Sequence, residues 1–241
     1  MASTYAQFRP TYPSALFNWL AELVPNHDLA WDCAAGSGQA SVDLAKHFKK
    51  VVATDASEAQ LKQATPHPKI DYRLAPAENS GLPNSSVDLI TVAQALHWFD
   101  LDRFYTEVRR VSKRNGVLAV WCYGVFRFES EAINTLVQDF YNNIVGPYWA
   151  PERRHVESGY QTLPFPFNEI SSPHFEMKTD WTLAQLLGYF RSWSATVRFI
   201  AECKFDPVQD LEKKLISLWG PRDSTRAIHW PLAVRAGKVL I

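Results

Sequence analysis

The sequence predicts an α/β protein in which helices pack on both faces of a doubly wound, mostly parallel sheet. Three observations carry this prediction: short apolar strands alternate with helical segments, a pair of glycines follows the first strand, and an acidic residue ends the second. Strands separated by single helices form βαβ units, whose right-handed crossovers place the carboxyl ends of the strands along one edge. We therefore expect the binding residues at that edge.

Apolar spacing defines the elements of the first half in order. The segment TYPSALFNWLAELV can form a helix from about Pro13, with an apolar face of Leu16, Trp19, Leu20 and Leu23. Ser57 and Asp100 are typical helix N-caps, and Gly116 is typical of a helix end. Further helices are expected over residues 39–50, 57–64 and 100–116. Strands are expected over residues 29–34, 51–55, 69–75, 87–95 and 116–124.

The second half of the chain has a different composition. Residues 126–168 are rich in aromatic residues and cannot be regular throughout, because they contain Pro147, Pro151, Pro164 and Pro166. Helical spacing returns over residues 182–193 and 206–220, and residues 229–240 are expected to form a last strand. We expect residues 126–168 to be an insertion over the binding edge, followed by elements that close the sheet. A separate helical domain is the alternative, disfavoured because no linker precedes the segment.

Composition argues against several classes of partner. Lysine plus arginine equals aspartate plus glutamate at 25 each, so no overall basic charge favours nucleic acid. No apolar run approaches the roughly 20 residues that span a bilayer, and MASTYAQFRP lacks a signal-peptide core. Three widely separated cysteines match no disulfide framework or metal spacing. We expect a cytoplasmic globular protein with no membrane or nucleic-acid partner and no metal.

The stretch AWDCAAGSGQ at residues 30–39 combines an apolar strand with a loop of small residues. Ala34, Gly36 and Gly38 form A-x-G-x-G rather than the G-x-G-x-x-G of dinucleotide-binding loops. Small residues let the backbone approach an adenosine ligand, and the loop amides can meet a carboxylate. S-adenosylmethionine fits, because it joins adenosine to a sulfonium and a methionine end without any phosphate. NAD is the main competitor.

Acidic residues end the two strands beside this loop. Asp55 lies 19 residues after Gly36, where a carboxylate can accept both ribose hydroxyls of an adenosine. Asp32 ends the first strand and can hold an ammonium group directly or through water. The loop together with Asp55 is a more specific signal of an adenosine-binding site than the loop alone, because many tight turns contain A-x-G-x-G.

With these features the chain resembles the class I S-adenosylmethionine-dependent methyltransferases, in the type-11 group that includes trans-aconitate methyltransferase. The resemblance is nearly full length and strongest over residues 8–124; it rests on FRPTYP, WDCAAGSGQ, VVATDAS, APAENSGLP, DLITVAQALHWFD and EVRRVSKRNGVLAVWCY. It implies a seven-stranded Rossmann-like methyltransferase sheet, with S-adenosyl-L-methionine as cofactor and S-adenosyl-L-homocysteine as product. Such loops often read D-x-G-x-G-x-G, so Ala34 replaces the first glycine and would be strained at a positive φ.

The resemblance also implies one domain over residues 1–241. Within it, residues 1–28 would form an N-terminal arm and helix, and residues 29–125 the cofactor-binding core. Residues 126–168 would form an acceptor-site insertion or lid, and residues 169–241 the closing elements.

Individual roles follow from the same resemblance. Ala77 and Glu78 would hold the adenine edge, and Ala56 would pack on adenine. The implied cofactor-binding set is Tyr5, Arg9, Asp32, Ala34, Gly36, Ser37, Gly38, Gln39, Asp55, Ala56, Ala77, Glu78, Gln94 and Ala95. The expected acceptor contacts are Tyr12, Trp98, Tyr123, Tyr148 and Trp149. The alternative interpretations are a solvated Glu78, an N-terminal arm that packs on the core, and a lid whose aromatic residues form its own small core.

The segment QALHWFD places His97, Trp98 and Phe99 after the fourth strand, beside the expected methyl-transfer site. His97 can orient an acceptor, act as a base or satisfy a backbone group, and its residue type does not decide among these roles. We expect the orienting role, and for Phe99 simple packing against the next helix.

A small-molecule acceptor is favoured because the D/N-P-P-Y/F/W motif of DNA amino-methyltransferases is absent. Relatives of trans-aconitate methyltransferase suggest a carboxylate and thus O-methylation, with Arg9, Arg153, Arg154 or Arg191 as its partner. Two alternatives remain open. One is a nonenzymatic protein that retains the fold; the other is an NAD-dependent oxidoreductase, which lacks a third glycine and a Tyr-x-x-x-Lys pair.

Overall fold

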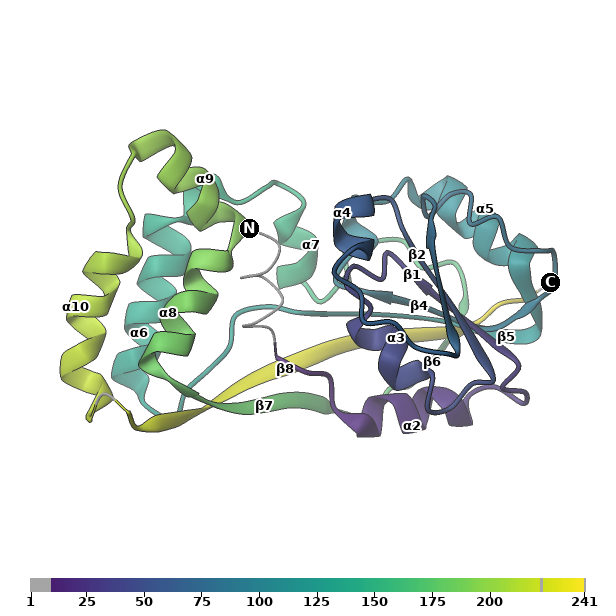
Figure 1. Cartoon of the computed structure of the whole chain (residues 1–241), viewed down its shortest axis with the longest axis horizontal. Coiled ribbons are helices and arrows are strands. Elements are labelled where there is room, and N and C mark those ends of the chain that lie inside the picture. The colour runs from purple at the N-terminus through teal and green to yellow at the C-terminus, as the bar shows by residue number, and fades with distance from the viewer. Residues whose placement is uncertain (1–9, 222, 241) are drawn as a thin grey trace. The chain divides into compact units, whose positions relative to one another are not determined.

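The fold is taken from a computed structural model that describes residues 10–221 and 223–240 (Figure 1). The chain divides into two compact units, which we call the sheet unit and the helical unit. The sheet unit comprises Thr11–Gly124, Arg154–Glu176 and the segment from Pro231, whereas the helical unit comprises Val125–Arg153 and Met177–Trp230. Arg154–Glu176 therefore belongs to the sheet unit, and the expected insertion over residues 126–168 does not coincide with either unit.

Eight strands form one sheet in the described part of the chain, in the order β3-β2-β1-β4-β5-β8-β6, with β7 paired to β8. The strands are β1 (Leu29–Cys33), β2 (Lys50–Asp55), β3 (Ile70–Leu74), β4 (Val87–Ala93), β5 (Ser112–Tyr123), β6 (Asn168–Ile170), β7 (Phe175–Thr182) and β8 (Thr225–Lys238). The first five are parallel, and β8 runs antiparallel to β5 and β6. The fold class is confirmed, but the seven strands implied by the resemblance are one too few: the described sheet has eight, and the residue patterns predicted six of them, without β6 and β7.

Helices cover both faces of this sheet, as Figure 1 shows for α2 (Ser14–Glu22) and α3 (Gln39–Leu44) on one side and α5 (Leu101–Val111) on the other. Neighbouring residues of β5 show the same division, since successive side chains of a strand point to opposite faces. Trp121 packs edge-on against Phe17 of α2 at 6.2 Å, whereas Cys122 belongs to the core under α5. The short helix α4 (Glu58–Leu61) follows β2.

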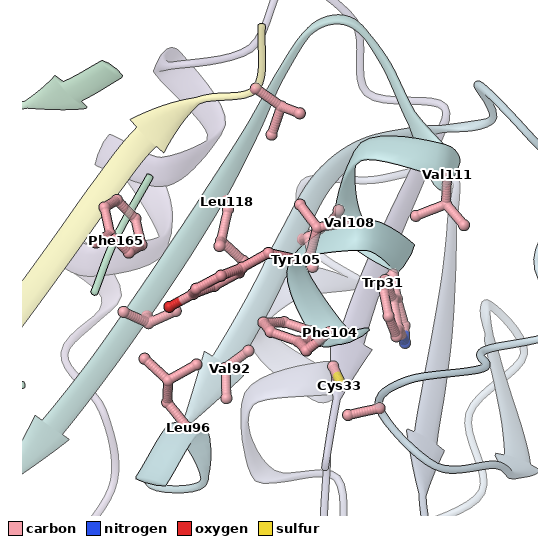
Figure 2. Packing of buried hydrophobic residues seen from close by; sticks show 14 of the residues in the cluster. Trp31, Cys33, Val92, Leu96, Phe104, Tyr105, Val108, Val111, Leu118 and Phe165 are labelled. Carbon is pink, nitrogen blue, oxygen red and sulfur yellow. The ribbon is translucent and has the colours of Figure 1, made fainter. Parts of the chain in front are cut away.

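The core under α5 contains apolar side chains from the helix and from the central strands. Figure 2 shows Phe104, Tyr105 and Val108 of α5 on the side of the helix that faces the strands. Trp31 of β1 is fully buried there, and its indole nitrogen donates to Thr54 Oγ1 at 2.8 Å. Buried indole N–H groups usually find such a partner, and here the bond joins the side chains of the first two strands in addition to their sheet pairing.

The start of α5 is as the sequence predicts, but its end is not. Asp100 is the N-cap, because its side chain accepts from the backbone N–H of Arg103 at 3.3 Å. The predicted end at Gly116 is wrong: the helix stops at Val111, and Ser112 begins β5 opposite Val87. A Cβ at Gly116 would overlap the hydroxyl of Ser112, so a glycine serves this irregular start of the strand instead of a helix end.

The helical unit contains α6 (Glu131–Asp139), the π-helical turn η2 (Phe140–Ile144), the 3₁₀ turn η3 (Gly146–Tyr148), α8 (Leu183–Ser192), α9 (Ser194–Cys203) and α10 (Val208–Trp219). The helices predicted over residues 182–193 and 206–220 correspond to α8 and α10. Thr182 and Gln185 form a capping box at the start of α8. The interior is aromatic and includes Phe126, Phe140, Tyr189, Phe190, Trp193 and Trp230.

Candidate functional site

The strand order reverses between β1 and β4, where ligands bind in open α/β sheets at the carboxyl ends of the strands. Asp32 of β1 lies opposite Ala53 of β2 and Thr91 of β4. The segments that follow these three strands therefore meet at one place in the sheet unit. They carry most of the cofactor-binding residues that the sequence predicts.

The loop after β1 contains three left-handed residues: Ala34 (φ 55°), Gly36 (φ 59°) and Gly38 (φ 81°). The positive φ at Ala34 confirms the expected strain, since only glycine adopts this region without cost. A Cβ at Gly38 would also overlap the Tyr72 phenol, whereas at Gly36 the nearest atom would be Gln60 Oε1 at 3.9 Å. A Cβ at Gly36 would thus meet its surroundings only at ordinary contact distance. Ser37 is half-buried beside it, and Gln39 begins α3.

The carboxylate of Asp55 binds this loop directly. Its Oδ2 accepts from Gly36 N at 2.8 Å, and its Oδ1 accepts from Ser57 N at 2.8 Å. A carboxylate has about four acceptor positions, so both oxygens keep capacity for the two hydroxyls of a ribose. The residues therefore fit an adenosine ligand, while the ligand contact itself stays a prediction.

Asp32 is fully buried and is held by two hydroxyl groups. Ser41 Oγ donates to its Oδ2 at 2.5 Å, and Thr91 Oγ1 donates to its Oδ1 at 3.0 Å. Burial raises the pKa of the Asp32 carboxyl to about 6, against the opposing effect of these two hydroxyls. The side chain links β1, α3 and β4, and its predicted role toward an ammonium group stays a prediction.

The loop after β3 is tied to α5. Ser80 donates to Glu107 Oε1 from both its backbone N–H, at 2.8 Å, and its hydroxyl, at 2.5 Å. Glu78 Oε1 accepts from Asp100 N at 3.1 Å, so this glutamate is not simply solvated. Ala77 is buried, whereas Ala56 after β2 is exposed. The predicted adenine contacts of these residues stay predictions.

The segment after β4 carries two predicted cofactor-binding residues, Gln94 and Ala95, and one predicted acceptor residue, Trp98. Gln94 is left-handed (φ 58°) and donates through Nε2 to Tyr123 O at 3.0 Å, and Ala95 follows it half-buried. The 3₁₀ turn η1 (Leu96–Trp98) then leaves the Trp98 side chain 59% exposed. Phe99 packs on Phe104 of α5 at 4.9 Å, as its predicted packing role requires.

His97 has a partner that the sequence analysis missed. Its Nδ1 lies 3.0 Å from the hydroxyl oxygen of Tyr160, which is 63 residues further along the chain. No sequence motif joins these two residues; the unusual left-handed conformation of Tyr160 (φ 63°) is a signal that only the structure provides.

The N-terminal arm is described only from Pro10, so Tyr5 and Arg9 lie outside the described residues. Tyr12 is 7% exposed and lies within ring-contact distance of Trp121 (5.5 Å) and Tyr123 (6.4 Å). This geometry is what the arm-packing alternative predicts for Tyr12. Its predicted contact with an acceptor stays a prediction, as does that of Tyr123.

Tyr148 and Trp149 belong to the helical unit. The Tyr148 hydroxyl lies 3.2 Å from Cys203 Sγ, and Trp149 Nε1 donates to Tyr141 O at 3.3 Å. Arg153 lies over the Trp149 ring, with its guanidinium carbon 4.8 Å from the ring centroid. Their predicted acceptor contacts stay predictions.

The described residues contain neither a cluster of metal-ligating side chains nor a helix suited to span a membrane. No group of three or more His, Cys, Asp or Glu side chains is placed to hold a metal ion in that part of the chain. No helix within it combines the length and apolar character needed to cross a bilayer.

Comparison with known proteins identifies the family to which this chain is similar. A family model described as a methyltransferase domain matches residues 31–120. A Dictyostelium discoideum protein named as a methyltransferase is 35% identical over 226 residues, which are 92% of this chain and 86% of that protein. A Saccharomyces cerevisiae protein named as an S-adenosylmethionine-dependent methyltransferase is 28% identical over 168 residues, 65% of this chain and 58% of that protein.

A solved structure that is similar to this chain is also described as a methyltransferase. A protein from Anaeromyxobacter dehalogenans described as a type II methyltransferase is 45% identical, with a TM-score of 0.91. The match covers 97% of this chain and 99% of that one. These relatives decide for S-adenosylmethionine over NAD and for an enzyme over a nonenzymatic protein. The chain belongs to the methyltransferase domain family and is a class I S-adenosylmethionine-dependent methyltransferase.

Proposed function

We propose that the protein transfers a methyl group to a carboxylate oxygen of a small-molecule acceptor. One observation carries the proposal: the end of β4 offers an exposed indole at Trp98 beside an imidazole held in place at His97. An aromatic surface next to a hydrogen-bonding ring suits a small acceptor that has an apolar part and an oxygen to be oriented. The balanced charge of the chain supports a small molecule over a polyanion.

Methylation of a carboxylate requires few catalytic groups from the protein. S-adenosylmethionine, when bound, supplies a methyl group that its sulfonium has already activated. A carboxylate oxygen carries no proton to be removed, so alignment of the acceptor and exclusion of water supply most of the catalysis. In this proposal Asp55, which is held by the backbone N–H of Gly36, binds the ribose hydroxyls, and His97 donates a hydrogen bond that orients the acceptor.

Among the arginines proposed to pair with the acceptor, Arg154 is favoured. Arg191 already pairs with Asp206 at 2.7 Å, and Arg153 donates to the hydroxyl of Tyr141 at 2.9 Å. Arg9 lies outside the described residues. Arg154 is exposed on α7 (Arg153–Glu157), the helix that precedes Tyr160 in the sheet unit.

A methyl-transfer screen tests the proposal. Purified protein is incubated with methyl-labelled S-adenosylmethionine and matched panels of small carboxylic acids, phenols and amines. We expect label in carboxyl methyl esters, which base hydrolyses to labelled methanol, whereas phenol ethers and methylamines resist this treatment. Transfer confined to phenols or amines would contradict the carboxylate assignment.

His97→Asn then tests the orienting role. This variant keeps a hydrogen-bonding side chain of similar size, so we expect a raised KM for the acceptor with kcat and cofactor affinity little changed. A fall in kcat of roughly 10²–10⁴-fold at saturating acceptor, with a normal Tm, would instead identify His97 as a general base.

A further inference from the structure

The position of Tyr160 bears on which hydrogen bond His97 can make to an acceptor. Its hydroxyl oxygen lies 3.0 Å from His97 Nδ1, with the two ring centroids 5.9 Å apart. In a neutral imidazole one nitrogen carries the proton and the other accepts, and the hydrogen bond at one nitrogen selects the tautomer. The Tyr160 contact therefore bears on the proton position in His97.

The backbone of Tyr160 is held in a conformation that an aromatic residue rarely adopts. Gly159 and Tyr160 are both left-handed, with φ of 60° and 63°. Such a conformation persists only where the surroundings over-determine it, and these outliers cluster at functional sites. Tyr160 N donates to His155 O at 2.7 Å, and a Cβ at Gly159 would lie 2.8 Å from the Cβ of Ala233 in β8.

Arg235 of β8 supplies the restraint on the other side of Tyr160. Its Nη1 donates to the carbonyl oxygens of Tyr160, at 2.8 Å, and Leu163, at 3.0 Å. Its Nη2 and Nε donate to the two oxygens of Glu169, and its guanidinium lies over the Phe165 ring. Charge-assisted bonds in a fork geometry are strong and directional. Arg235 is only 9% exposed, so this clamp is part of the fold.

The hydroxyl of Tyr160 is fully enclosed, since no part of this residue is exposed. A phenol O–H is a stronger donor than a neutral imidazole N–H, and an imidazole nitrogen is a stronger acceptor than a phenol oxygen. We propose that Tyr160 is a positioning residue: its hydroxyl donates to Nδ1 of His97 and keeps the imidazole in the tautomer protonated on Nε2.

This tautomer gives His97 a defined role. With the proton on Nε2, the ring is a hydrogen-bond donor at that atom and suits a carboxylate oxygen. A general base acting through Nε2 would require the opposite tautomer, with Nδ1–H donating to Tyr160. The consequence for the acceptor rests on the proposed function, whereas the tautomer is a property of the protein alone.

Nitrogen NMR tests the tautomer without any acceptor. Protein labelled with ¹⁵N-histidine is measured at a pH of about 8.5, where a free imidazole is neutral. The chain has seven histidines, so the resonances that disappear in His97→Asn identify His97. We expect Nε2–H in the wild type, and in Tyr160→Phe a downfield shift of Nδ1 toward an unbonded nitrogen. An Nδ1–H tautomer, or an unmoved Nδ1 resonance in Tyr160→Phe, overturns the proposal.

Tyr105→Phe is the matched control. It also removes one hydroxyl from the same region, because Tyr105 OH donates to Pro164 O at 2.6 Å. We expect lower stability in this variant but an unchanged His97 spectrum. A shift of His97 as large as that in Tyr160→Phe would mean that general loosening, not the Tyr160 hydroxyl, moves the resonance, and it would overturn the proposal.

Kinetics separate the proposal from the proposed function. With an acceptor from the screen, Tyr160→Phe should raise KM roughly 3- to 10-fold, as expected for one hydrogen bond, with kcat little changed. The double variant with His97→Asn should be no worse than His97→Asn alone, because both act through one interaction. The expected spectra combined with a collapse of kcat would support the Tyr160 assignment and contradict the orienting role.

Discussion

The sheet unit and the helical unit bury different kinds of side chain. Ten polar or charged residues are buried in the described part of the chain, and nine of them belong to the sheet unit; Thr196 is the one in the helical unit. The helical unit instead packs aromatic rings against one another. The single residue Trp193, for example, lies within ring-contact distance of Phe140, Tyr189 and Phe190.

This difference reflects what each unit has to do. Buried polar groups require hydrogen-bond partners at defined positions, and those partners place the loop, Asp32 and His97 to within a narrow range of orientations. Ring packing tolerates small displacements but carries a large apolar contribution to stability. The sheet unit therefore combines an apolar core with buried polar contacts of defined geometry, and the following variants test that division.

The largest effect is expected from Phe190→Ala in the helical unit. Phe190 is fully buried and contacts Phe126, Phe140 and Trp193. Its removal should lower the free energy of unfolding by about 3–5 kcal/mol through lost burial and a residual cavity. Val197→Ala in α9, at a side chain 38% exposed, is the control and should cost far less. Urea titration measures both. If Phe190→Ala reduced cofactor affinity as strongly as stability, the division between the units would fail.

The second-largest expected effect is a pH dependence of stability that arises from Asp32. Its pKa is raised from 3.8 to about 6 in the folded state, so the stability linked to its protonation is full below about pH 4 and is lost as pH rises through 6. Wild type should gain on the order of 3 kcal/mol over Asp32→Asn between pH 7 and pH 4. Unfolding titrations of both proteins across this range measure the difference. A constant difference would show that Asp32 does not titrate there.

Asp55→Ala should have a smaller effect, on cofactor binding. The substitution removes a carboxylate that accepts from Gly36 N and is predicted to accept the ribose hydroxyls. We expect a loss of roughly 1.5–3 kcal/mol in affinity for S-adenosylmethionine, measured by calorimetry. Asp102→Ala, at an exposed residue in the first turn of α5, is the control. An unchanged Kd for Asp55→Ala in a folded protein would move the ribose site elsewhere.

The smallest expected effect is a gain in the free energy of unfolding, from the substitution Ala34→Gly. Ala34 has φ of 55°, where glycine is not strained. Ala34→Gly should therefore raise the free energy of unfolding by about 0.5–1 kcal/mol, since the relief of strain exceeds the greater entropy of the unfolded glycine chain. Thermal unfolding detects it as a small increase in Tm. A lower Tm would mean that the Ala34 methyl group makes packing contacts worth more than the strain.

Local patterns explain why the sheet unit was largely predictable. The strands β1 to β4, the Asp100 cap and the loop beside Asp55 each follow from residues close together in sequence. The end of α5 was wrong because helical spacing continues past Val111, while the pairing of Ser112 with Val87 outweighs it.

Nonlocal features were not predictable in the same way. Strand β7 does show alternation, since Phe175 and Met177 are buried on either side of exposed Glu176, but the prolines nearby obscured it. The helical unit is assembled from two separated segments, so no linker marks its boundary. The contact of His97 with Tyr160 joins residues 63 positions apart, and nothing in either local sequence indicates it.

The Arg235 clamp has a consequence for the order in which the protein matures during synthesis. The loop, Asp55 and the five parallel strands are complete once β5 has ended at Tyr123. The carbonyl oxygen of Tyr160 accepts a hydrogen bond from Arg235, 75 residues further along the chain. This bond can form only after β8 has been synthesised. Because a nascent chain folds from its N-terminus, the residues proposed to bind the cofactor are assembled before those proposed to bind the acceptor. A ribosome-bound chain that lacks β8 would thus contain the proposed cofactor-binding residues without the hydrogen bond from Arg235 to Tyr160.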